Sequence, residues 1–204
     1  MSKPKKCILL GATGSIGESS LRVIRKHPDK LKLFGASGHS QADKLISIAQ
    51  EFKVTNLHLS RSPDALGSPS LETPINFGGN GLEELAAHPE ADLVVIAIVG
   101  TAALRPTLAA LEAGTDVVLA NKESLVLGGR IVTETARRTG ARIIPADSEH
   151  NAVFQCLQGQ NEKSLDSIVL TASGGAFRDL PIERLKEVTP EQALQHPNWK
   201  MGPK

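Results

Sequence analysis

The chain has 204 residues, of which 23 are basic, 22 are acidic and 40% are hydrophobic. This length suffices for one large domain, or for one domain and part of another, and the balanced charge argues against a nucleic-acid or polybasic membrane surface. No apolar run approaches the roughly 18 residues of a membrane span, and the apolar stretch after the basic start is too short for a secretory signal. We therefore expect a cytoplasmic protein.

The first predicted elements are a strand at 5–12 and a helix at 16–29, joined by a glycine-rich turn. Gly11, Gly14 and Gly17 follow the spacing G-x-x-G-x-x-G between them. Glycine permits positive φ and close approach of a pyrophosphate, while a helix N-terminus offers free N–H groups. A plain strand–helix turn is the alternative, but the position of this triplet favours a nucleotide-binding loop.

The second predicted strand, at 30–37, bears on the choice of nucleotide. NAD-preferring loops carry an Asp or Glu at the end of this strand, whereas here the first acid is Asp43, already in the predicted helix at 41–53. Small polar residues and His39 stand where a carboxylate would repel a 2′-phosphate, so NADP is favoured. His39 can equally be a surface loop residue, and no arginine lies nearby in the sequence, which weakens the argument.

Strand–helix alternation continues to about residue 146 and predicts an α/β fold with a doubly wound parallel sheet. The further predicted strands are 54–60, 91–100, 115–123 and 141–149, the helices are 81–90, 105–114 and 132–140, and 61–81 is predicted as loop around a weak strand. Beyond it, 150–159 is predicted as a helix and 164–177 as a strand running into a glycine turn. We interpret Cys7 and Cys156 as reduced core residues.

Polar residues follow the later predicted strands, at the edge where ligands gather on such sheets. Asn121, Lys122 and Glu123 form one group, in which Lys122 could bind a phosphate or hydroxyl oxygen, although the tripeptide is non-specific and a helix-start cap is the alternative. Asp147 and Glu149 would point to the same side of an extended chain, where like charges repel unless water or a cation separates them. Hard carboxylate oxygens suit Mg²⁺ or Mn²⁺, and a solvated loop is the alternative.

Two later segments also have features of binding sites. Ser173 lies in a turn of small residues whose N–H groups and hydroxyl could take an anion. Trp199, the only tryptophan, lies near His196 in a proline-bounded stretch and suggests a lid that closes over substrate. Partial burial of Trp199 against the body of the protein is the alternative.

These pieces, in this order, closely resemble the 1-deoxy-D-xylulose 5-phosphate reductoisomerase family of the non-mevalonate isoprenoid pathway. The matching motifs are GATGSIG, AIVGTAALRPTLAALEAG, LANKESLV, DSEHNAVFQ, SGGAFR and HPNWKMG. The resemblance implies a Rossmann-like NADP-binding domain at 1–146, followed at 147–204 by the start of an α+β catalytic domain. It also implies NADPH- and Mn²⁺- or Mg²⁺-dependent rearrangement and reduction of the ketose phosphate to 2-C-methyl-D-erythritol 4-phosphate.

The resemblance also assigns roles to individual residues. Contacts to NADPH are implied for Gly11, Thr13, Gly14, Ser15, Ile16, Gly38, His39, Ser40, Asn121 and Glu123. Substrate contacts are implied for Lys122, Ser148, Glu149, Ser173, His196 and Trp199, with Met201 in the same closing loop. The metal ligands would be Asp147 and Glu149, and the catalytic set Lys122, Asp147, Glu149 and His196.

Two departures from the family pattern qualify these roles. Residues 38–41 read Gly-His-Ser-Gln, which leaves the contacts to the 2′-phosphate open. The sequence also stops at Lys204, before the family segments that supply a further metal-binding glutamate, an Asn-Lys pair for the substrate and a helical C-terminal domain. We therefore expect an impaired fragment that binds NADPH and is nearly inactive. The family resemblance further implies a homodimer.

Three rival functions were weighed. Short-chain dehydrogenases share the glycine loop but need a Tyr-x-x-x-Lys pair, and this chain has no tyrosine. Aspartate-semialdehyde dehydrogenases use a cysteine nucleophile, and Cys156 lacks their surrounding pattern. A non-catalytic NADP-binding module remains the alternative function.

Overall fold

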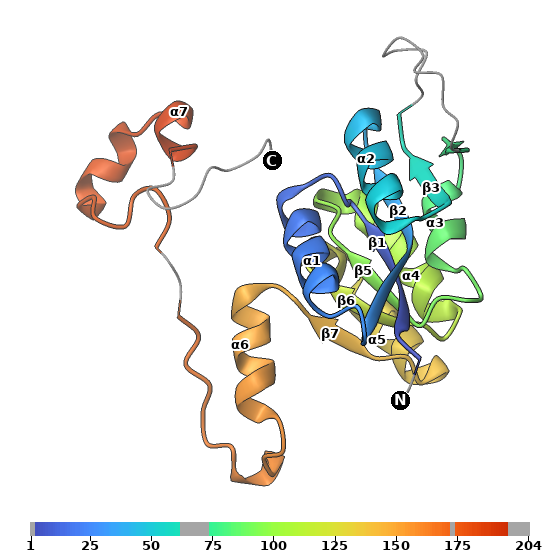
Figure 1. Ribbon diagram of the computed structural model, residues 1–204. Coiled ribbons are helices and arrows are strands. Elements are labelled where there is room, and N and C mark those ends of the chain that lie inside the picture. The colour runs from blue at the N-terminus through green and yellow to red at the C-terminus, as the bar shows by residue number, and fades with distance from the viewer. Residues whose placement is uncertain (1–2, 62–73, 172–173, 196–204) are drawn as a thin grey trace. The chain divides into compact units, whose positions relative to one another are not determined.

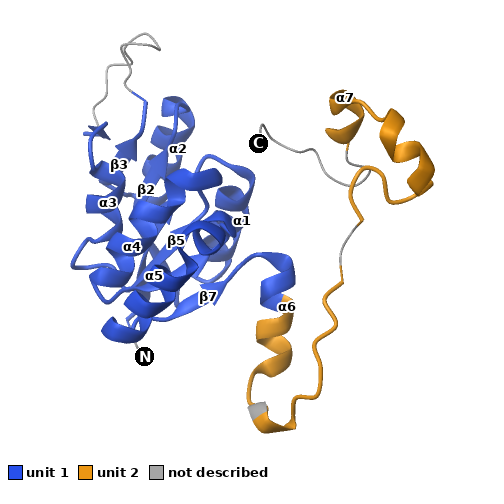
Figure 2. Ribbon diagram, turned by 180° about the vertical axis from the view of Figure 1, so that it is seen from behind, with its two compact units in different colours: residues 1–151 blue, residues 152–204 orange. Residues whose placement is uncertain are grey.

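The computed structural model describes residues 3–61, 74–171 and 174–195 (Figure 1). The chain forms two compact units, residues 1–151 and 152–204 (Figure 2). The division falls inside helix α6 (Ser148–Leu157), slightly after the predicted domain boundary at 146, which stays a prediction. Within the described residues, no helix combines the length and the apolar character needed to cross a bilayer.

The first unit is built on a seven-stranded, entirely parallel sheet with strand order β4-β3-β2-β1-β5-β6-β7. The strands are β1 (Lys5–Leu10), β2 (Leu31–Gly38), β3 (Asn56–Leu59), β4 (Asn76–Phe77), β5 (Leu93–Ile96), β6 (Asp116–Leu119) and β7 (Ile143–Pro145). The order runs outward in both directions from β1 and β5. The predicted α/β fold with a doubly wound parallel sheet is therefore confirmed.

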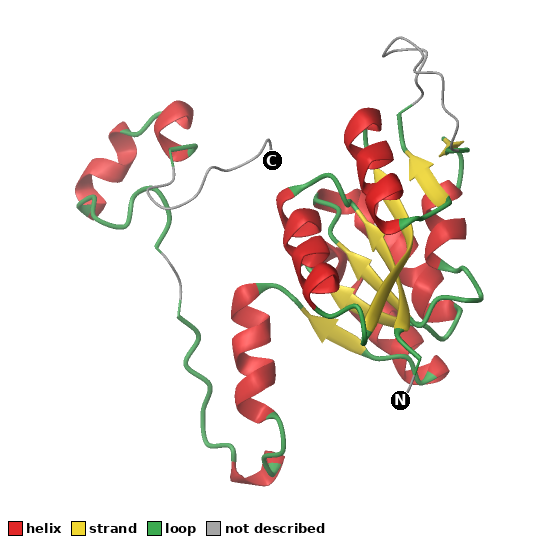
Figure 3. Cartoon of the chain, viewed as in Figure 1, coloured by secondary structure: helices red, strands yellow, loops and turns green. Residues whose placement is uncertain are grey.

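Helices cover both faces of this sheet (Figure 3). They are α1 (Ser15–Lys26), α2 (Ala42–Phe52), α3 (Gly81–Ala86), α4 (Leu104–Glu112) and α5 (Glu123–Thr139), with a 3₁₀ turn η2 (Gly100–Ala103) before α4. Each face has its own hydrophobic core, and β1 contributes to both because successive side chains of a strand alternate between faces. Cys7 and Leu9 pack in the core with α1 and α2, whereas Ile8 and Leu10 pack in the core with α3, α4 and α5.

The second unit contains short elements. It comprises most of α6, then the 3₁₀ turns η3 (Glu162–Ser164) and η4 (Ile182–Glu187) and helix α7 (Pro190–Ala193). Thr189 and Gln192 form a reciprocal capping box at the start of α7. No residue that the structure describes between 152 and 195 is a buried hydrophobic one.

Three sequence predictions differ from the structure. The helix predicted at 132–140 is the second half of α5, which begins at Glu123 and bends at Gly128, where φ and ψ are −127° and 23°. The strand predicted from 164 is wrong over its described residues, because a strand needs a paired neighbour and none of the described segments pairs with it. Cys156 is exposed, so only Cys7 is a core cysteine.

Candidate active site

The candidate site lies at the carboxyl edge of the sheet, where the glycine loop follows β1. On either side of β1 and β5 the strand order proceeds in opposite directions, which makes the ends of these two strands the topological switch point. Ligands of open α/β sheets bind in the crevice at such a point. The loops after β1, β2, β5, β6 and β7 all reach this edge.

Two glycines of the loop are required by close packing. Gly11 has φ of +87°, and a methyl group there would lie 2.6 Å from the carbonyl oxygen of Ala97, after β5. A methyl group at Gly17 would lie 2.6 Å from the backbone carbonyl of Ala12. Both positions therefore exclude any side chain, and the loop lies tightly between the ends of β1 and β5.

Gly14, the middle glycine of the loop, is exposed and differs from the other two. The atom nearest to a methyl group at Gly14 would be the Gly11 carbonyl oxygen, at 3.5 Å. Gly14 occupies the N-cap position of α1, and no side chain caps the helix. The first amides of an α-helix lack intrahelical partners, so the exposed turn at Ser15 and Ile16 can receive an anion.

The glycine loop is held by β2 and α2. The Gly11 amide donates to Ser37 Oγ at 3.1 Å, and the Ala12 amide donates to the Ser37 carbonyl at 2.8 Å. From α2, Lys44 Nζ donates to the Thr13 carbonyl at 3.0 Å. No local sequence signal marks Ser37 or Lys44, because their contacts to the loop join residues 25 or more positions apart.

The residues predicted to meet the adenosine ribose lie at the end of β2. A methyl group at Gly38 would lie 3.2 Å from the Thr13 methyl group, so Gly38 lets the Thr13 side chain pack against the strand. Thr13 is 9% exposed, and Lys44 contacts its backbone carbonyl rather than its side chain. His39 is exposed and Ser40 is half-buried, which leaves both accessible to a ligand.

Asn121 joins the ends of β5 and β6. Its Nδ2 donates to the carbonyls of Ile98 and Gly100, each at 3.0 Å, and its Oδ1 accepts from the Ser124 amide at 2.8 Å and hydroxyl at 2.7 Å. The side chain is 2% exposed, so the Asn121 amide group is occupied by the protein itself. Asn121 thus acts by fixing the loop after β5 and the start of α5.

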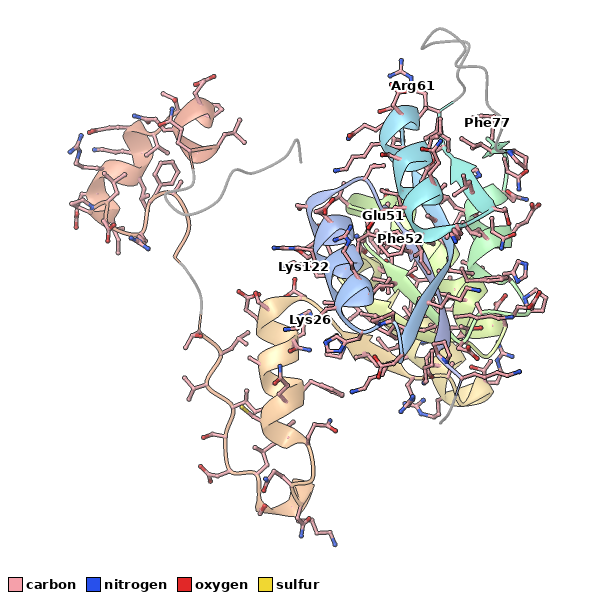
Figure 4. The ribbon with its side chains drawn as sticks, in the orientation of Figure 1. Lys26, Glu51, Phe52, Arg61, Phe77 and Lys122 are labelled. Carbon is pink, nitrogen blue, oxygen red and sulfur yellow. The ribbon has the colours of Figure 1, made fainter. Side chains whose placement is uncertain are left out.

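Lys122 and Asp147 are brought together from the ends of the neighbouring strands β6 and β7. Lys122 Nζ lies 2.8 Å from Asp147 Oδ2, and the Asp147 side chain is only 12% exposed while that of Lys122 is 52% exposed. Lys122, labelled in Figure 4, projects from the turn that starts α5. The structure therefore unites two residues of the predicted catalytic set.

The same contact controls the charges of this pair. The hydrogen bond to Asp147 raises the pKa of Lys122, against a smaller effect of burial. Burial acts to raise the pKa of Asp147, but the hydrogen bond from Lys122 and the positive charge of Lys122 outweigh it and lower that pKa. Near neutral pH, Asp147 is an anion and Lys122 is a cation.

The geometry predicted for Asp147 and Glu149 is wrong in one respect. The chain is not extended there: β7 ends at Pro145 and α6 begins at Ser148, so the two acids do not share the side of a strand. The Asn151 amide donates to the Asp147 carbonyl at 2.8 Å and closes the first helical turn. Ser148 Oγ donates to Glu149 Oε2 at 2.8 Å.

Other predicted site residues are not brought together here. Over residues 3–61, 74–171 and 174–195, no cluster of three or more His, Cys, Asp or Glu side chains could hold a metal ion. Asp147 and Glu149 alone offer anionic oxygens of the kind that Mg²⁺ and Mn²⁺ prefer, which fits part of such a site. Ser173, His196, Trp199 and Met201 lie outside the described residues.

Comparisons with known proteins identify the family of this chain. The family model for 1-deoxy-D-xylulose 5-phosphate reductoisomerase matches residues 7–129, and the model for its C-terminal domain matches residues 143–204. The reductoisomerase of Ralstonia nicotianae is 48% identical, and the match covers 96% of this chain and 52% of that protein. The chain thus spans about half the length of the curated relatives it matches.

Two solved structures extend the likeness to three dimensions. A crystal structure of DOX-P reductoisomerase in complex with NADPH, fosmidomycin and magnesium is 41% identical, with a TM-score of 0.83 over 97% of this chain and 52% of that one. The enzyme from Zymomonas mobilis in complex with NADPH is 37% identical, with a TM-score of 0.84 over 96% of this chain and 52% of that one. Because the two family models together match residues 7–129 and 143–204, this chain belongs to the 1-deoxy-D-xylulose 5-phosphate reductoisomerase family.

Proposed function

We propose that this chain supplies the NADPH-binding part and the first metal-binding carboxylates of an enzyme that converts 1-deoxy-D-xylulose 5-phosphate to 2-C-methyl-D-erythritol 4-phosphate. The observation that carries this proposal is the Lys122–Asp147 contact at the same sheet edge as the glycine loop. A cofactor loop alone would fit many dehydrogenases. A partly buried carboxylate held by a lysine after β7 would add a site for substrate and metal.

The glycine loop fits a dinucleotide. Gly11 and Gly17 leave no room for side chains, so the backbone comes close to any bound pyrophosphate, and Gly14 leaves the approach open. The uncapped start of α1 would donate its free amides to phosphate oxygens. His39 and Ser40, which are accessible at the end of β2, would meet the adenosine ribose. NADPH would supply the hydride for the reduction step.

On the other half of the sheet, Lys122 and Asp147 would act on the substrate. Asp147, with Glu149, would hold the divalent ion that polarises the ketose oxygens. Lys122 would donate hydrogen bonds from its ammonium group to a substrate oxygen and so remain cationic. Asn121 positions Lys122, because its hydrogen bonds to Ser124 fix the turn from which Lys122 projects. We extend the substrate assignment to Ser148, Ser173, His196 and Trp199, and the cofactor assignment to Glu123.

Three measurements on the purified chain test the proposal in order. Calorimetry should detect NADPH binding, and titration with Mn²⁺ should detect a site that Asp147→Asn weakens at least tenfold. Glu134→Gln is the matched control, since Glu134 is an exposed acid of α5 paired with Arg130. Oxidation of NADPH with 1-deoxy-D-xylulose 5-phosphate and Mn²⁺ then measures turnover. Absence of NADPH binding, or Mn²⁺ binding that both variants leave unchanged, would contradict the proposal.

A non-catalytic NADP-binding module is the second candidate function. It is favoured by the two-carboxylate donor set, since among the described residues no third ligand joins Asp147 and Glu149. We accordingly propose that the 204-residue chain binds NADPH and turns over slowly by itself. NADPH binding without substrate-dependent oxidation would identify this state. Homodimer formation is likewise proposed, and sedimentation would measure it.

A further inference from the structure

The end of β2 carries the main feature that the proposed function leaves open, which is the origin of any preference for NADPH over NADH. Discrimination requires a cation for the 2′-phosphate, and an arginine is the usual choice. None of the residues from Leu31 to Lys53 is an arginine. An arginine for this role must therefore come from another element.

The pairing of β3 with β2 brings an arginine to this place. The two parallel strands are in register with Gly38 opposite Leu59, and their hydrogen bonding continues past the ends of both strands. The Ser60 amide donates to the Gly38 carbonyl at 3.1 Å, and the Arg61 amide donates to the His39 carbonyl at 2.8 Å. Arg61 is thus a direct neighbour of His39, although 22 positions separate them.

The side chain of Arg61 is available for a ligand. Arg61 is exposed, and its guanidinium forms no ion pair with a carboxylate of the described residues. Figure 4 shows it at the opposite end of α2 from Glu51 and Phe52, which is the end that follows His39 and Ser40. The guanidinium is therefore on the side of α2 where the adenosine ribose is expected.

The end of β2 lacks the acidic side chain that selects NAD. Residues 38–41 contain no acid, and the nearest one, Asp43, lies in the first turn of α2. Lys44 adds a second cation on the glycine-loop side, where it contacts the Thr13 carbonyl. A phosphate placed at the end of β2 would therefore meet cationic and neutral donors from two elements.

We propose that Arg61 is the specificity-determining residue that binds the 2′-phosphate of NADPH, with His39 and Ser40 as its neighbours. This inference rests on the proposed function, since it assumes a dinucleotide at the glycine loop. A planar guanidinium can donate two parallel hydrogen bonds to phosphate oxygens, which an ammonium does not reproduce. NADH, which lacks the phosphate, gains nothing from Arg61.

Titration calorimetry of NADPH and NADH against the wild type and Arg61→Gln tests the inference. Loss of a charge-assisted contact should weaken NADPH binding by about 10- to 150-fold and leave NADH binding within about twofold. Arg61→Gln keeps the backbone amide that donates to His39, so the strand pairing is preserved. Arg138→Gln, an exposed arginine in the last turn of α5, removes the same charge at the other edge of the sheet and should change neither affinity.

The possible outcomes separate the two proposals. If the wild type binds neither dinucleotide, the proposed function fails. If it binds NADPH and Arg61→Gln keeps the wild-type ratio of NADPH to NADH affinity, this inference fails and the proposed function stands. Binding of 2′,5′-ADP compared with 5′-AMP provides a second readout, and only the former should weaken in the Arg61 variant.

Discussion

Replacement of Gly17 by alanine tests the claim that the glycine loop is built by close packing. The new methyl group would lie 2.6 Å from the carbonyl carbon and oxygen of Ala12, and these backbone atoms cannot move without shifting the loop. Overpacking of this kind costs about 3 kcal/mol at the upper end of its range. Alanine in a helix returns about 1 kcal/mol relative to glycine, so the net loss of stability is about 2 kcal/mol.

The assay is thermal unfolding followed by circular dichroism. For a protein of this size, about 2 kcal/mol lowers Tm by about 4–8 °C. Gly129→Ala is the matched control, because Gly129 lies in α5 and no atom lies within 4 Å of the position its methyl group would take. The same chemical change there should raise Tm by about 2–4 °C. Equal shifts for the two variants would refute the packing argument.

Three further predictions concern buried polar groups. Burial raises the pKa of the Cys7 thiol to about 11, so a thiol reagent should label exposed Cys156 in the native protein and Cys7 only after unfolding. Burial lowers the pKa of His58, whose Nδ1 has no hydrogen-bond partner among the described residues, although nearby glutamates oppose the shift. The unfolded state therefore binds more protons than the folded state below about pH 6.5. As the pH falls below this value, the free energy of unfolding should decrease less steeply for His58→Gln than for the wild type. Asn121→Ala removes four buried hydrogen bonds and should lower the free energy of unfolding by about 3 kcal/mol, measured by urea denaturation.

Local sequence signals predicted the sheet well. Gly11 and Gly17 stand where their neighbours forbid a side chain, and the apolar runs of β1, β5 and β6 are those of strands covered on both faces. The geometry at Asp147 was missed because the preceding strand was extended too far. Asp-Ser before a helical pattern is a typical helix start, and that signal could have placed the start of α6 at Ser148.

Contacts between distant residues could not be predicted from the sequence. The approach of Arg61 to His39 depends on the register of β2 and β3, which no local pattern determines. The strand expected after residue 164 failed for a related reason. Ile168 and Val169 are 53% and 85% exposed, because an apolar β-prone segment forms a strand only when another strand accepts its hydrogen bonds.

The two groups of proposed site residues lie on opposite halves of the sheet, and under the proposed function this division would orient the cofactor. Arg61 and His39 follow β3 and β2, whereas Lys122 and Asp147 follow β6 and β7, and the glycine loop lies between them after β1. A dinucleotide whose pyrophosphate meets the start of α1 and whose adenosine extends over β2 must extend its nicotinamide toward β5 and β6. Under the proposed function, the reacting ring would then come to the half that holds the Lys122–Asp147 pair. Cofactor choice and substrate chemistry should therefore be separable, so that we expect variants of Arg61 to change nucleotide preference and variants of Asp147 to change metal and substrate binding.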